Sequence, residues 1–574
     1  MSTVPTPEEL VTLFQQGLLV RKLLNLFSVR DRDLQRNVEK LFIDLHNSDA
    51  VDMLQLVKSG AFKELSTSEF FTVMHSYCRI LPQLKAAPAK MMTCVESLVA
   101  QGGQDLAANL PNAAFRSWCI NNPQLAEEVV SAAQDGDELA SRHLTFALEA
   151  THSIAAARKI AIEYEDKRRI SAITALSRIT DDDAISRAET LTVFSKILGS
   201  SSADDDFNAN LLSAIAKVLR QGPEQHSTDA LALMRQVLVD PSELTVHAAA
   251  QVLCDDADIL QPEIVSCLLN ALMHLNPENK GTIRQLDMGL HSLLDHGHFD
   301  AAINYVTAYL SKDNIGLKLE ELPTFSSALT NGPTERLSRV VVLWLLKGLP
   351  ALCDGLSNAM KGRGMEGTPV YLNAEDLAIS SSDKIFLCRK AVGWFFLKPI
   401  TAASILVSVL RVCDEETSQE VQKLLVQDLL VNYGGVRKYL GSIADDDPAK
   451  GRIVKCVAMN EAYLSALNSI PAIKELQPSE HHRRIERLRV ADQMHDVHKQ
   501  ARNQSPFLSL VKRSVLLYGN RSLSFRKDND GQLLPMEMDL KPYGISFEMP
   551  RMEIVDPVGL DYTLRVFRTE RRRP

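Results

Sequence analysis

The sequence has few aromatic residues and no closely paired cysteines. Phe, Trp and Tyr make up 6% of its 574 residues, whereas leucine and alanine are frequent, a balance that favours helices over sheets. The nine cysteines are odd in number, and no two of them are separated by only two residues, as zinc ligands often are. Because nearly all have apolar neighbours, we expect buried free thiols in a reducing, cytoplasmic environment.

Motifs of the common enzyme classes are also missing. The chain contains no Gly-x-Ser-x-Gly elbow, no Walker phosphate loop and no His-Glu-x-x-His metal motif. One Gly-x-Gly-x-x-Gly match, at residues 362–367, follows an expected helix rather than a strand, so it lacks the context of a dinucleotide site. We therefore expect no cofactor. An enzyme is the third interpretation, and its catalytic residues would have to come from distant positions.

No long apolar run predicts a membrane span. The nearest candidate, residues 391–410, is split by Lys398 and Pro399, which indicates a broken, buried helical hairpin. The first residues show no basic segment followed by an apolar run, so no secretory signal is expected. We expect no association with membranes.

What the sequence contains in abundance is helical periodicity, strongest at residues 135–311. Apolar residues recur there at helical spacing between short polar turns. Each expected pair of helices leaves an apolar face that only a neighbouring pair can cover, so the pairs must stack. They follow one another at about 30–40 residues, the period of stacked helical pairs. The pairs are expected to begin near residues 137–140, 167–170, 207–210, 243–246 and 281–284.

One of these helices carries a resemblance to a known repeat class. Ala248, Ala249 and Ala250 would lie close together in a helix and let a neighbouring backbone approach. With them, residues 244–253 resemble the second helix of a HEAT or armadillo repeat. The resemblance implies an α-solenoid, and in such families the concave surface binds peptides, proteins or nucleic acid. No motif of these families is matched in full, so no binding residue is carried over.

The pattern changes near the end of the chain. After Gly519, apolar residues alternate as in strands, for example at Tyr562, Leu564 and Val566. The predicted fold class is therefore mainly α, an α-solenoid of stacked helical hairpins with a small β-rich C-terminal unit. The predicted regions are an N-terminal helical region (1–134), a helical-repeat core (135–311), a further helical region with loop insertions (312–480), and a basic helix followed by the β-rich unit (481–574).

The last of these regions, residues 481–574, differs from the rest of the chain in net charge. The whole chain has a formal net charge of −9, to which residues 481–574 contribute +6 and the remainder −15. Cations on the expected basic helix could follow nucleic-acid phosphates. Interleaved acids such as Glu486 and Asp496 favour a simply solvated helix. The candidate nucleic-acid-binding residues are Arg483, Arg484, Arg487, Arg489, Lys499 and Arg502.

The same helix offers a candidate metal site. Asp492, His495 and His498 share a helical face, and the three-residue spacing of the two histidines is compatible with one bound metal ion. The alternative is that all three are exposed polar residues.

Taken together, these features predict a non-enzymatic, cytoplasmic scaffold or adaptor that presents an interaction surface to protein partners. The alternative is a nucleic-acid-associated subunit of a larger complex, which would use its basic C-terminal region.

Overall fold

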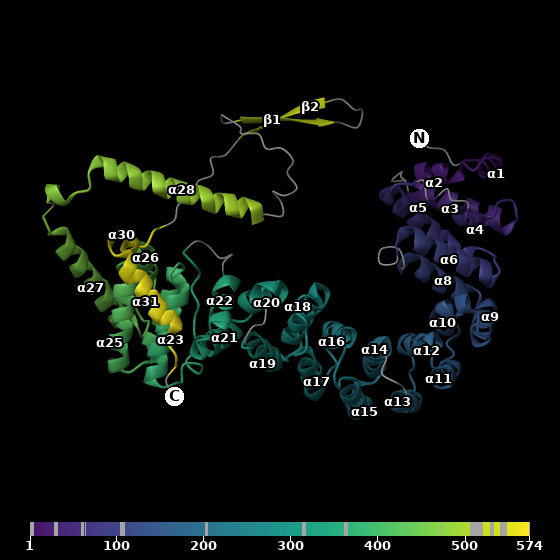
Figure 1. Ribbon diagram of the computed structural model, residues 1–574, viewed down its shortest axis with the longest axis horizontal. Helices are drawn as coiled ribbons and strands as arrows, with labels where there is room; N and C mark the ends of the chain where they lie inside the picture. The colour runs from purple at the N-terminus through teal and green to yellow at the C-terminus, as the bar shows by residue number, and fades with distance from the viewer. Residues whose placement is uncertain are drawn as a thin grey trace. The chain divides into compact units, whose positions relative to one another are not determined.

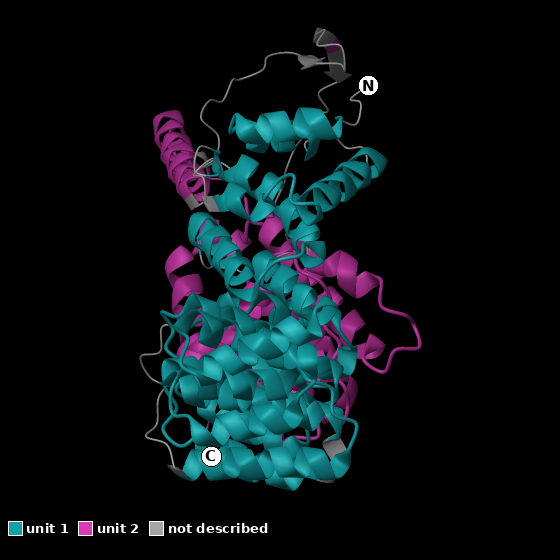
Figure 2. Ribbon diagram, turned by 90° about the vertical axis from the view of Figure 1, so that its right-hand side faces the viewer, with its two compact units in different colours: residues 1–336 teal, residues 337–574 magenta. Residues whose placement is uncertain are grey.

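The computed structural model describes residues 5–27, 32–58, 62, 65–103, 109–200, 205–312, 317–360, 366–471, 473–504, 521–527, 533–539 and 548–572. The chain divides into two compact units, unit 1 (residues 1–336) and unit 2 (residues 337–574), which Figure 2 shows in different colours. The segment 361–365, which holds most of the Gly-x-Gly-x-x-Gly match, lies outside the described residues.

Unit 1 consists of short helices in succession. They are α1 (Pro7–Gln15), α2 (Leu19–Phe27), α3 (Arg32–Asn47), α4 (Met53–Lys58), α5 (Thr67–Ile80), η2 (Leu81–Gln83), α6 (Pro88–Gly102), α8 (Asn109–Asn121), α9 (Pro123–Gln134), α10 (Glu138–Thr151), α11 (Ile154–Glu163), α12 (Lys167–Arg178), α13 (Ala184–Ser200), α14 (Asp205–Gln221), α15 (Pro223–Val237), α16 (Glu243–Asp256), α17 (Pro262–Leu272), α18 (Lys280–Asp295), α19 (Phe299–Leu310), η3 (Leu319–Glu321) and α20 (Pro323–Asn331).

From α10 to α20 these helices form two layers. The even-numbered helices α10 to α20 contact one another in order, and α11, α13, α15, α17 and α19 do the same in a second layer. Figure 1 shows the two layers running side by side through the teal part of the ribbon. Helices α10, α12, α14, α16 and α18 begin within two residues of the five predicted starts. The helical-repeat prediction is therefore confirmed for this region.

Side chains at the helix starts explain why these helices begin near the predicted positions. The side chains of Asp137, Ser242 and Asn279 accept hydrogen bonds from backbone N–H groups in the first turns of α10, α16 and α18. Such caps satisfy donors that the helix itself leaves unpaired. Proline occupies the start of α6, α9, α15, α17 and α20, where its missing N–H costs nothing.

Close packing between α16 and α18 is set by Gly289. A Cβ atom at this glycine would lie 3.1 Å from the Cβ of Leu253 and 3.3 Å from the backbone oxygen of Ala250. Leu253 is fully buried, whereas Gln251 on the other side of α16 is exposed. Of the three alanines predicted to let a neighbouring backbone approach, Ala250 is the one whose backbone lies at this contact.

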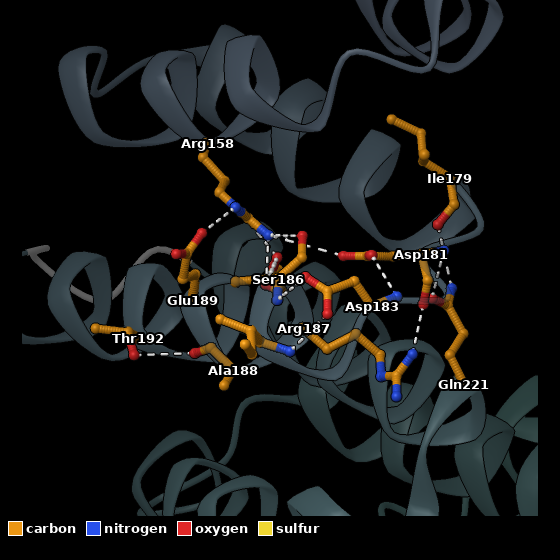
Figure 3. A network of polar contacts seen from close by, with 12 residues as sticks. Arg158, Ile179, Asp181, Asp183, Ser186, Arg187, Ala188, Glu189, Thr192 and Gln221 are labelled. Atoms are coloured by element: carbon orange, nitrogen blue, oxygen red, sulfur yellow. Dashed lines mark hydrogen bonds and ion pairs between the residues drawn. The ribbon is translucent and has the colours of Figure 1, made fainter.

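Successive repeats are joined by polar contacts in addition to apolar contacts. Figure 3 shows Arg158 of α11 reaching Ser186 of the next pair and Glu189, whose carboxylate lies 2.7 Å away. The side-chain amide of Gln221 on α14 donates to the backbone oxygen of Ile179 and accepts from the backbone N–H of Asp181. Because such bonds link residues about one repeat apart, they fix the register of the stack.

Unit 2 contains α22 to α31, together with most of α21, in which the boundary falls. Its elements are α21 (Thr334–Lys347), α22 (Pro350–Ala359), α23 (Ser381–Phe395), α24 (Pro399–Val412), α25 (Glu415–Leu424), the π-helix η4 (Leu425–Leu430), α26 (Gly434–Gly441), α27 (Lys450–Asn468), η5 (Lys474–Leu476), α28 (Glu480–Gln504), β1 (Arg521–Lys527), β2 (Leu533–Asp539), α30 (Arg551–Val555) and α31 (Pro557–Thr569).

The split apolar run at residues 391–410 forms the end of α23 and most of α24. Both helices are largely buried. The apolar run is broken where predicted, because Lys398 lies in the turn between the helices and Pro399 is the first residue of α24. Across the described ranges, no helix combines the length and apolar character needed to cross a membrane.

The predicted β-rich C-terminal unit is wrong. Residues 557–569, which include Tyr562, Leu564 and Val566, form helix α31. In the described part of residues 481–574, strands are limited to the antiparallel pair β1 and β2, and an isolated two-stranded hairpin is not a β-rich unit. Asp556 caps α31 by accepting a 3.0 Å hydrogen bond from the N–H of Gly559, and Pro557 starts it. These residues specify a helix start.

Candidate interaction site

The predicted nucleic-acid-binding residues all lie on α28 in unit 2. Every residue from 480 to 503 is exposed, including all six predicted cations. Helical geometry places only some of these cations on one side. Arg484, Arg487 and Arg502 share a face with the histidines of the predicted metal site, whereas Arg489 lies off that face, 3.6 Å from Glu486. Arg483 and Lys499 border that face on its two sides.

No metal centre is formed by the side chains of the described residues. Asp492, His495 and His498 are all exposed on α28. Among the described residues, no three or more His, Cys, Asp or Glu side chains are grouped so that they could hold a metal ion. All nine cysteines are free, and seven of them are buried.

A cavity that the sequence did not predict lies in unit 2. Its volume is about 720 Å³, within the usual range for a binding pocket. Helices α30 and α31 form one wall, and the α23–α24 turn and the residues before α26 form the other. Its lining residues are Glu366, Phe396, Leu397, Pro399, Tyr433, Glu548, Met549, Pro550, Glu553, Pro557, Leu560, Asp561, Leu564 and Arg568.

The cavity exists because residues 548–572, hereafter the C-terminal segment, dock on α23. A Cβ atom at Gly393 would lie 3.0 Å from the Cβ of Phe567, so only glycine lets α31 approach this closely. The side chain of Arg568 donates a 2.6 Å hydrogen bond to the backbone oxygen of Gly393. The fully buried Lys390 donates a 2.7 Å bond to the backbone oxygen of Arg568. In Figure 1 the yellow α31 lies alongside α23.

Ion pairs hold the end of the segment. Arg572 donates two hydrogen bonds, of 2.6 and 2.7 Å, to the two carboxylate oxygens of Asp383. These bonds lower the pKa of the Asp383 carboxyl. Arg389 donates a 3.0 Å bond to Glu570. Paired, two-point contacts of this kind fix geometry as well as adding energy.

The start of the segment is held at the N-terminus of α26. The carboxylate of Glu548 accepts hydrogen bonds of 2.6 and 3.0 Å from the N–H groups of Gly434 and Gly435. A carboxylate is favoured there because the helix N-terminus carries partial positive charge. The side chain of Asn432 accepts a 2.9 Å bond from the N–H of Met552. Both walls of the cavity are therefore tied together.

Tyr433 is the unusual polar group of this cavity. Its side chain is buried against the ring of Phe396, with centroids 5.4 Å apart. Its hydroxyl has no hydrogen-bond partner among the described residues. Burial, reinforced by the negative charges of Glu548 and Glu553, raises the pKa of this hydroxyl, so it remains protonated and can donate. A buried hydroxyl without a hydrogen-bond partner destabilises the folded state, because the group has lost its water and gained no bond in exchange.

Exposed apolar residues adjoin the cavity. On α31, Val558 and Tyr562 are 79% and 70% exposed, and with Val566 they repeat at four-residue spacing. Leu397 at the cavity edge is 71% exposed. We call Leu397, Val558, Tyr562 and Val566 the apolar stripe. The opposite side of α31, with Leu560 and Phe567, faces α23 and the cavity.

Comparisons with known proteins place the chain in no family. No protein-family model and no curated protein sequence matches it. An engineered protein solved by crystallography is 13% identical, covers 77% of this chain and 98% of its own, and has a TM-score of 0.27. A circular tandem repeat protein is 14% identical, with coverages of 80% and 98% and a TM-score of 0.19. These TM-scores are too low to indicate a shared fold, and it is the stacking of α10 to α20 that defines the helical-repeat class.

Proposed function

We propose that this helical-repeat protein is a non-enzymatic scaffold that binds a protein partner through the cavity of unit 2 and the apolar stripe beside it. The observation that carries the proposal is the position of large exposed apolar side chains next to an apolar cavity. Clusters of this kind are typical of interaction sites, and a pocket that accepts an anchoring side chain is a common centre of a protein interface.

The construction of the site supports the same proposal. The C-terminal segment is fixed by charged contacts at Asp383 and Glu570 and by the buried Lys390. A rigid wall loses little conformational freedom when a partner binds, which favours affinity.

Affinity purification of the full-length chain from its native host tests the proposal, after crosslinking in the cell. The test variants are Val558→Asp and Tyr562→Asp. The control is Ile185→Asp, because Ile185 on α13 is 72% exposed and distant from the site in sequence. Proteins recovered by the wild type and the control should be lost from both test variants. Recovery of the same proteins by all four chains would overturn the proposal.

A second candidate function, nucleic-acid binding, is favoured by one specific observation. Arg484, Arg487 and Arg502 recur at helical spacing on one exposed face of α28, together with His495 and His498. Glu480, in the first turn of the helix, and Asp492, at the edge of the face, are the acidic residues nearest to them. Such a face could follow a phosphate backbone.

Matched arginine substitutions on α28 test this candidate. Binding of the intact chain to short single- and double-stranded oligonucleotides would be measured at two salt concentrations. Replacing Arg484, Arg487 and Arg502 with Ala should weaken binding, and each lost phosphate contact should reduce the log–log salt slope by about 0.7–0.9. Replacing Arg489, which lies off the face, should have a smaller effect. Absence of binding by the wild type at low salt would eliminate this candidate.

A further inference from the structure

The cavity in unit 2 is apolar in its walls but acidic in its polar groups. Phe396, Leu560 and Leu564 form part of the wall, and the charged groups that line it from the described residues are four carboxylates and one guanidinium. An interface selects its partner largely by complementary charge. The chemistry of this lining therefore describes what the cavity accepts.

The four carboxylates differ in what they already bind. Glu548 is occupied by two N–H groups of α26, and Asp561 lies 2.9 Å from the side chain of Arg565. The side chains of Glu366 and Glu553 have no hydrogen-bond or ion-pair partner among the described residues. Two carboxylates are thus available to a positively charged group that enters the cavity.

Tyr433 supplies an independent observation. Its side chain is only 3% exposed and lines the cavity, and its hydroxyl is without a partner in the described residues. The Tyr433 hydroxyl is therefore a buried hydrogen-bond donor and acceptor to which the surrounding described residues offer no partner. A peptide backbone or polar side chain in the cavity would satisfy it.

We propose that the cavity binds a segment of a partner protein in which a lysine or arginine stands beside apolar residues. The long aliphatic stem of either side chain would lie on the apolar wall while its charged head reaches Glu366 and Glu553. The Tyr433 hydroxyl would bond to the segment as well. This inference rests on the proposed function, because it specifies the chemistry of the partner.

Other segments fit the same lining less well. An acidic or phosphorylated segment would be repelled by carboxylates without partners. A purely apolar segment would cover Glu366, Glu553 and the Tyr433 hydroxyl without replacing the water that they lose. The basic and apolar combination is the one that leaves no polar group without a partner.

The test uses the full-length protein and a pair of labelled synthetic peptides. In the first peptide, leucines alternate with lysines; in its twin, glutamines replace the lysines. Fluorescence anisotropy should show tighter binding of the lysine peptide, by about twofold to fivefold for each exposed ion pair. Glu366→Gln combined with Glu553→Gln should abolish this preference, and Tyr433→Phe should weaken both peptides.

The control replaces two exposed carboxylates of unit 2 that do not line the cavity, by Glu416→Gln and Asp445→Asn. It changes net charge by the same amount and should retain the preference. Equal affinity of the wild type for both peptides, or an equal loss in the control, would overturn the inference. Partner recovery in the Val558→Asp comparison does not depend on Glu366 or Glu553, so failure of the proposed function would be recognised separately.

Discussion

The buried ammonium group of Lys390 donates its hydrogen bond to the backbone oxygen of Arg568, 178 residues later in the chain. This oxygen belongs to the last turn of α31, where backbone carbonyls lack partners within the helix and where positive charge is favourable. A single side chain on α23 thus completes the end of the helix that closes the cavity.

Lys390→Met should detach the C-terminal segment. Methionine has a similar volume and fills the space but cannot donate, so the carbonyl oxygen of Arg568 stays buried without a partner. We expect a loss of about 1–3 kcal/mol in the free energy of unfolding. Limited proteolysis should then cleave between α30 and α31 earlier than in the wild type. Unchanged cleavage would show that the contact does not hold the segment.

Gly393→Ala should separate α31 from α23. The new Cβ would meet the Cβ of Phe567 at 3.0 Å, and overpacking of this kind costs about 1–3 kcal/mol. Gly451→Ala is the control, since a Cβ at Gly451 on α27 meets nothing within 4 Å. The control should be neutral or stabilising by up to about 1 kcal/mol. Thermal unfolding of both variants distinguishes close approach from a general effect of losing glycine.

Leu253→Ala should destabilise unit 1 by about 2–5 kcal/mol, the range for a buried leucine that leaves a cavity. Leu253 is fully buried against the α16–α18 contact, whereas Gln251 is exposed. Gln251→Ala on the same helix should therefore change the free energy of unfolding very little. Denaturant titrations measure both, and equal effects would contradict the packing of these two helices.

The free energy of unfolding should depend on pH through the carboxyl group of Asp428. Burial raises the pKa of its carboxyl from 3.8 to about 6. Because the folded state binds this proton more tightly than the unfolded state, the contribution to stability is present below about pH 4 and is lost as pH rises through about 6. Asp428→Asn should therefore be more stable than the wild type at pH 7, by about 1–3 kcal/mol. At pH 4 the two should unfold alike; a constant difference would contradict the raised pKa.

Residues close in the sequence made the repeat region predictable. Asp137 and Ser242 indicate helix starts, and Ala250 of α16 lies at a close contact with the next helix of its layer. The C-terminal error has an equally local cause. On α31, Tyr562 and Val566 lie on the exposed side of the helix and Leu564 lies on the cavity side. Because both sides carry apolar residues, apolar residues recur at every second position, as they would in a strand. Asp556 and Pro557 were the signal that would have identified the helix.

The cavity itself could not be predicted in this way. Glu548 meets Gly434 and Gly435 across more than a hundred residues, and Arg572 meets Asp383 across a longer distance still. Neither partner has a local pattern that indicates the other. Gly393 also looks like an ordinary weak point in an apolar helix until α31 is placed against it.

The docking of residues 548–572 on α23 also has a consequence during protein synthesis. Translation produces α23 and α26 well before the segment that covers them. Until residue 572 has been made, the side of α23 that carries Lys390 and Gly393 has no helix packed against it. The newly made chain then exposes apolar surface that chaperones recognise. Ribosomes that slow or stop within this interval would leave a unit whose helices are formed but whose cavity is absent.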